Sequence, residues 1–344
     1  MDEQDYLMTL LELYGEPDGP GDQWTPAQQA WHQARNQQLG ISNAPPSKDA
    51  LLDFRESYIR NYLLAPILET LDPAERMRID NVPIAFANLR TLNAETRLAP
   101  NGKPVILLNQ GVASLVSYWW EMKAALNHIR KKSGPKASES HLLESYSFLL
   151  LFYANNGQAS YPRSFEGITE EEMHVVLIHS IRTEIFILAH EVQHVLLNHL
   201  RPELDQGQNE SEEMSRRGRQ ELDADRFGML TYLNAWTMTP WFSGSLSTTD
   251  LLVPMDYFTL RHLIERNPEI GPSAAVPSGH PSAEVRAKAL LAPYFTSNNP
   301  IHETIKDELR DWMRYFLSVP NLVEHFTEIS RHLHLFETNG EEKP

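Results

Sequence analysis

The stretch ILAHEVQHVLLNHL, residues 187 to 200, places two histidines and a glutamate inside an otherwise apolar run. His190 and His194 are four residues apart, so on a helix they lie on one face and their ring nitrogens can converge on one ion. Glu191 lies about 100° further around the axis, from where its carboxylate reaches a water beside the ion. This is the H-E-x-x-H arrangement of a zinc-binding helix. The alternative is a core helix whose histidines are merely hydrogen-bonded.

The choice between these two interpretations depends on a third ligand, because a catalytic zinc takes three protein ligands and keeps one open position. A further histidine on the same segment would need a glycine turn, but Leu197 and Leu200 occupy the positions for the glycine and the histidine. His199 is one residue out of place, which favours a role at the helix end.

A carboxylate on a second helix is the better prediction for that ligand. In RQELDADRFGMLTYL, residues 219 to 233, Glu221 and Asp225 are four residues apart and share a face. Ala224 and Gly228 form a neighbouring stripe without bulk, which allows close approach to the first helix. We expect Glu221 to bind the metal, Asp225 to accept a hydrogen bond from the far nitrogen of His190 or His194, and the competing Asp223 to point elsewhere.

The composition restricts the partners and the kind of metal site. The 344 residues contain 46 acidic and 30 basic side chains, giving a net charge of −16. This balance argues against nucleic acid or an anionic membrane surface as the main partner. There are no cysteines, so a zinc site must use His, Asp and Glu. The N-terminus MDEQDYLMTLLELYG lacks a basic region, and the apolar stretch LLESYSFLLLFYA is too short to span a bilayer. We therefore expect a cytoplasmic protein.

Helical periodicity dominates the chain and predicts a mainly α fold of the α+β type. Two short apolar segments, 81–89 and 103–109, are expected to pair as a small sheet beside the zinc helix. The chain is divided into a helical N-terminal region (1–79), a zinc-binding domain (80–295) and a helical C-terminal cap with an acidic tail (296–344). The expected helices cover roughly 3–14, 26–39, 47–71, 111–132, 139–154, 170–200, 212–236, 251–266, 282–291, 302–317 and 321–335.

The order of four segments resembles the glutamate-zincin metallopeptidases of the HtpX and BepA type. HEVQHVLLNH is followed by ELDADRFG and by SGHPSAEVRAKAL, which is similar to the HPSxxxR segment of that family. The upstream LNAETRLAPNGKPVILLNQGVASL resembles the turn and strand that precede the zinc helix there, and in that family substrate lies along this strand. The resemblance covers about half of the chain. A weaker resemblance, limited to the H-E-x-x-H motif and general layout, is to the Lit-type phage-exclusion peptidases.

The resemblance implies a zinc endopeptidase that acts on protein or peptide substrates, with Glu191 as the general base. It also implies that His280 lies near the metal on a mobile loop and assists catalysis, and that Arg286 binds Asp225 or Glu221. Two alternatives stay open: a peptidase confined to one cellular target, as in phage defence or stress response, and a zinc-containing module that binds a partner without turnover. Nothing in the sequence indicates the oligomeric state.

Overall fold

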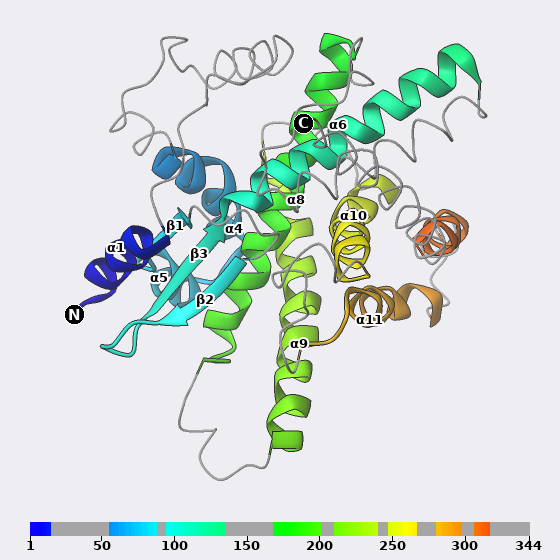
Figure 1. The fold of residues 1–344 in the computed structure, drawn as a ribbon. Helices are drawn as coiled ribbons and strands as arrows, with labels where there is room; N and C mark the ends of the chain where they lie inside the picture. Colours follow the sequence, from blue (N-terminus) through cyan, green and yellow to red (C-terminus); the bar gives the residue numbers. More distant parts are fainter. Residues whose placement is uncertain are drawn as a thin grey trace, which may run out of the picture.

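Helices make up most of the computed structural model, which describes residues 1–14, 55–87, 94–134, 168–200, 210–239, 247–266, 280–296 and 306–316. Within these residues the predicted mainly α fold with a small sheet is confirmed (Figure 1). The elements in chain order are α1 (Glu3–Tyr14), the π-helix η1 (Ile59–Leu64), α4 (Ala65–Thr70), α5 (Pro73–Asp80), β1 (Ile84–Ala87), β2 (Ala94–Leu98), β3 (Pro104–Asn109), α6 (Gln110–Ser133), α8 (Glu170–Leu196), α9 (Glu210–Thr237), α10 (Thr248–Glu265) and α11 (Ala283–Thr296). Residues 306–316 are also helical.

The sheet has three strands in the order β1-β3-β2. β1 pairs parallel with β3, and β2 pairs antiparallel with the other edge of β3, with Thr96 opposite Ile106. The expectation of two strands was therefore incomplete. β2 was missed because its sequence, AETRL, contains no apolar run, and four of its five residues are only partly buried.

The central strand β3 is buried on both faces, which explains its unbroken apolar sequence. Val105 and Leu107 pack in a small core with Leu7 and Leu10 of α1. Ile106 and Leu108 point the other way, into the main core that also contains most of α8. The N-terminal helix therefore covers one face of the sheet, and the other face lies against α8.

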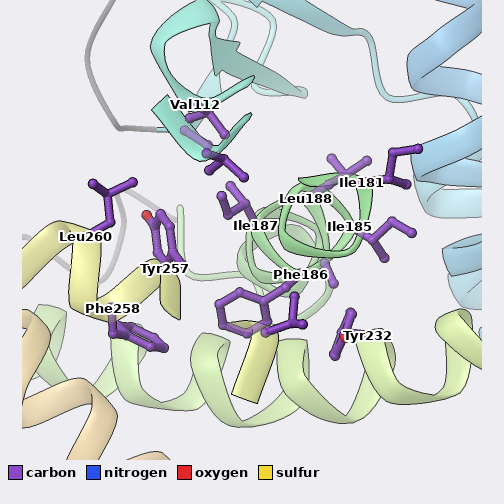
Figure 2. Close-up of a cluster of buried hydrophobic side chains, with 14 of the residues drawn as sticks. Val112, Ile181, Ile185, Phe186, Ile187, Leu188, Tyr232, Tyr257, Phe258 and Leu260 are labelled. Carbon is purple, nitrogen blue, oxygen red and sulfur yellow. The ribbon is translucent and has the colours of Figure 1, made fainter. Parts of the chain in front are cut away.

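Helix α8 carries the H-E-x-x-H motif through the centre of the molecule. Its start is fixed by a capping box in which Thr169 and Glu172 each bind the other's backbone. Every residue from Ser180 to Gln193 is buried, which fits a helix that has neighbours on all sides. Figure 2 shows the packing around it: the Phe186 ring lies with its centroid 5.8 to 6.2 Å from those of Tyr232, Tyr257 and Phe258.

The C-terminal end of α8 is closed by a residue from the N-terminal region. The helix ends at Leu196, four residues before the predicted end, and Asn198 adopts a left-handed backbone with φ 54°. The guanidinium of Arg78, in α5, donates hydrogen bonds to the carbonyls of Val195 (2.8 Å) and Leu196 (3.2 Å). The carbonyl of Val195 also accepts a hydrogen bond of 3.2 Å from the N–H of Asn198, so Arg78 adds side-chain donors to carbonyls at the helix end and holds the turn that follows the motif.

Helix α9 runs antiparallel to α8, and the two lie side by side (Figure 1). Ala224 is fully buried, as the predicted small-residue stripe requires. Helix α10 packs against α8 and α9, and α11 packs against α9 and α10. No helix among the described residues is long and apolar enough to cross a membrane.

Several predicted segments cannot be compared with the structure. The helices expected over 26–39, 139–154 and 321–335, and the acidic tail, lie outside the described residues. The division of the chain at residues 79 and 295 stays a prediction. The short helix α5 was missed, although its start carries a readable signal: Asp72 and Glu75 form a capping box around Pro73 at the first helical position.

Candidate metal centre

His190, His194 and Glu221 come together at the contact between α8 and α9. One ligand atom from each lies within 4.8 Å of the others, and this is the one such group of three among the described residues. The two Nε2 atoms are 3.1 Å apart. The Glu221 carboxylate lies 3.6 Å from Nε2 of His190 and 3.4 Å from Nε2 of His194. Antiparallel helices produce this arrangement because two residues spaced by four on α8 meet one residue on α9.

These distances fit a tetrahedral metal ion. Nitrogen and oxygen ligands that lie about 2.0 to 2.1 Å from zinc in tetrahedral geometry are about 3.3 Å from one another. The two Nε2 atoms are 3.1 Å apart, and each lies near that distance from one oxygen of Glu221: Oε2 is 3.6 Å from His190 and Oε1 is 3.4 Å from His194. The side chain of His194 keeps 12% of its surface accessible, against 9% for the other two. The three residues can therefore hold a metal ion, and His194 is the least buried of them.

The ring of His190 is oriented from α9. Its Nδ1 lies 3.0 Å from Oδ1 of Asp225, so Nε2 is the nitrogen that faces the centre. Burial by itself lowers the pKa of His190, but hydrogen bonds to Asp225 and Glu221 outweigh it and raise the pKa to about 9. A metal ion that takes the Nε2 lone pair must displace this proton, so metal binding weakens in acid. Asp223, the competing carboxylate, is exposed to solvent.

Arg286 of α11 binds both carboxylates of α9. Its Nε and Nη2 form two hydrogen bonds of 2.7 and 2.6 Å with the Asp225 carboxylate, and its Nη1 lies 3.2 Å from Glu221. The sequence left open which carboxylate it would meet, and it meets both. Burial alone would raise the pKa of Asp225, but the charge and hydrogen bonds of Arg286 hold it below its usual value. The arginine thus keeps two neighbouring buried carboxylates ionised.

His280 lies at the edge of the centre, three residues before α11. Its Nδ1 is 3.4 Å from Oε1 of Glu221, and 31% of its side chain is exposed. Burial acts to raise the pKa of Glu221, but its hydrogen bonds to His190, His194 and His280 lower it well below the usual range. The structure therefore brings all seven predicted site residues into one cluster. Three of them are the possible ligands, and each of the other four lies within 4.0 Å of one of these ligands.

His199 belongs to this cluster, although the sequence placed it at the helix end. Its Nδ1 lies 3.1 Å from Nδ1 of His194, on the side of the ring opposite the metal centre. Burial and the nearby His194 lower the pKa of His199 to about 4, so its ring is neutral and can accept a hydrogen bond. Each histidine of the motif therefore has a partner at its far nitrogen: Asp225 for His190 and His199 for His194.

Glu191 also has a partner that sequence reasoning missed. The hydroxyl of Thr96, in β2, donates a hydrogen bond of 2.7 Å to Oε2 of Glu191. Oε1 of the same carboxylate lies 4.0 Å from Nε2 of His190 and faces the metal centre. The glutamate is thus beside the possible ligands without being one of them, which is the position expected of a general base.

Comparison with known proteins adds no assignment to this geometry. No protein-family model, no curated protein and no solved structure matches the chain. The resemblance to HtpX- and BepA-type peptidases therefore stays a prediction that depends on the motifs and on the arrangement of these residues.

Proposed function

We propose that this chain is a zinc-dependent endopeptidase that hydrolyses peptide bonds in protein substrates. The observation that supports this most is the position of Glu191, next to two histidines and a carboxylate that can bind one ion. A site that only bound zinc would need no base there, and a structural zinc is usually closed by four ligands.

The side chains divide the work in this proposal. His190, His194 and Glu221 bind the ion, which supplies Lewis acidity that lowers the pKa of water and polarises a carbonyl. Glu191 accepts a proton from the attacking water and delivers it to the nitrogen of the scissile bond, so that an acid and an amine leave. His280 donates a hydrogen bond to the oxyanion that forms on the attacked carbonyl. Asp225 orients the ring of His190, and Arg286 keeps the carboxylate of Glu221 ionised.

The substrate is proposed to lie along the edge of β2. This strand ends the sheet among the described strands and lies against α8. An extended peptide can add to such an edge through backbone hydrogen bonds, which would place its carbonyl groups near the metal centre. This mode of binding selects an extended conformation more than a particular sequence, and it agrees with the resemblance noted for this segment.

The proposal is tested by comparing wild type with Glu191→Gln in a zinc assay and a proteome-wide cleavage screen. We expect both proteins to bind one zinc per chain and only the wild type to cleave, with a chelator abolishing cleavage. His190→Ala should lose the metal. An active Glu191→Gln would disprove the mechanism. A zinc-loaded wild type that cleaves nothing would favour the partner-binding module, and cleavage of one protein but not of casein would indicate a target-specific peptidase.

A further inference from the structure

The backbone groups of Thr96 point away from β3, towards the edge of β2 that pairs with no other strand among the described residues. The amide of Ile106 donates its hydrogen bond to the carbonyl of Pro83, on the β1 side of β3. Ala99 donates to the carbonyl of Lys103, which fixes the alternation of hydrogen-bonded pairs between β2 and β3. The pair Thr96 and Ile106 is consequently a non-hydrogen-bonded pair of the antiparallel ladder. The N–H and C=O of Thr96 therefore face away from β3, at the edge where an added strand would pair.

The side chain of the same residue points to the general base. Oγ1 of Thr96 lies 2.7 Å from Oε2 of Glu191 and 3.2 Å from its backbone carbonyl. The hydroxyl has one proton, and the shorter contact is the one to the side-chain carboxylate. Within the described part of the chain, no other group donates a hydrogen bond to this carboxylate, and Glu191 is 5% exposed. Among the described residues, Thr96 is thus the hydrogen-bond donor to this carboxylate.

We propose that Thr96 is a positioning residue that connects the substrate edge with the general base. Its hydroxyl binds Oε2 of Glu191, so that Oε1 is the oxygen that faces the metal centre and accepts the proton. Its backbone N–H and C=O bind the peptide, so the register of the peptide is set at the residue that orients the base. This inference rests on the proposed peptidase function and adds a residue to it.

The role of the hydroxyl is separated from that of the backbone by two substitutions. Thr96→Val removes the hydroxyl and keeps the shape and the backbone groups, whereas Thr96→Ser keeps the hydroxyl and removes a methyl group. We expect Thr96→Val to lower kcat by about tenfold, a part of what a general base contributes, with KM and zinc content unchanged. Thr96→Ser should keep the wild-type kcat. Thr70→Val is the control, because it removes a partly buried hydroxyl that binds a carbonyl in α4.

A crystal structure of each full-length variant gives a readout that does not depend on activity. Oε2 of Glu191 should lie within about 3 Å of the residue-96 hydroxyl in wild type and Thr96→Ser. In Thr96→Val the carboxylate should be rotated or should occupy two conformers. An unmoved Glu191 in Thr96→Val, or a wild-type kcat for that variant, would overturn the inference. If wild type itself cleaves nothing, the proposed function fails, and the position of Glu191 in the Thr96→Val crystal still decides whether Thr96 positions it.

Discussion

Gly228 of α9 lies directly against the backbone of His190. A Cβ atom placed on Gly228 would come 3.0 Å from both Cα and N of His190, and 3.4 Å from the carbonyl carbon of Ala189. All three atoms belong to the backbone of α8, so an added methyl group could be accommodated only by a shift of the helix backbone and not by the movement of a side chain. The close approach of these helices brings Glu221 and Asp225 of α9 within reach of His190.

Gly228→Ala should therefore destabilise the protein, although alanine is the better helix former. Helix propensity alone predicts a gain of about 1 kcal/mol, whereas forcing extra volume into a packed contact costs about 1 to 3 kcal/mol. Separation of the helices should also weaken zinc binding. Urea unfolding of the metal-free protein and zinc content per chain measure the two effects. A variant more stable than wild type would show that α8 and α9 can separate without cost.

Among the charged residues of the centre, substitution of Arg286 is expected to lower the free energy of unfolding most. Its replacement by methionine leaves the buried carboxylates of Asp225 and Glu221 without their cation, and breaking a buried pair in this way costs about 3 to 5 kcal/mol. Arg266→Gln is the matched control, because Arg266 pairs with Glu284 at 3.4 Å while 53% of its side chain is exposed. Such a surface pair contributes at most about 1 kcal/mol. Equal losses in urea unfolding would contradict the role given to Arg286.

The parts of the centre that the sequence predicted are those governed by spacing along one helix. The four-residue intervals of His190 with His194, and of Glu221 with Asp225, place each pair on one face whatever the rest of the fold does. The assignment of Glu221 to the same ion needed a second idea, the small Ala224 and Gly228 that let two helices approach. Both patterns lie within single helices, so they can be recognised without knowing the topology of the fold.

The residues that the sequence missed depend on contacts that spacing does not encode. Thr96 is 95 residues from Glu191 in sequence and meets it only because β2 lies along α8. His199 lies beyond the end of α8, where the left-handed residue Asn198 turns the chain back towards His194. Helical periodicity ends at such a turn, so it assigned His199 to the helix end and gave it no partner.

His199→Ala is expected to weaken zinc binding without removing a ligand. A neutral His194 that presents the Nε2 lone pair to a metal must carry its proton on Nδ1, and this proton can be donated to Nδ1 of His199. Loss of such a partner typically lowers metal affinity by about 10- to 100-fold. Competition with a chromophoric chelator measures the affinity. His174→Ala, an exposed histidine near the start of α8, is the control. An unchanged affinity in His199→Ala would mean that packing alone orients His194.

His179 is expected to make the stability of the folded protein depend on pH, independently of the metal centre. Its ring lies against Trp120 with centroids 4.5 Å apart, and its Nδ1 is 3.4 Å from a guanidinium nitrogen of Arg182. Burial, followed by the charges of Arg182 and Lys123, lowers the pKa of His179 to about 3, against the opposing charge of Asp250. Because the unfolded chain titrates at an ordinary pKa near 6.5, it binds one more proton than the folded protein between these values.

The stability that His179 contributes should therefore be complete above about pH 6.5 and fall as the pH drops towards 3, by up to about 1.4 kcal/mol per pH unit. His179→Gln cannot bind this proton, so its stability should decrease less steeply in acid. Urea unfolding at about pH 7.5, 6 and 5, with both proteins free of metal, compares the slopes directly and removes the contribution of metal binding. Carboxylates that titrate in this range are common to both proteins and cancel in the difference. Parallel slopes would show that His179 is protonated in the folded protein, beside Arg182.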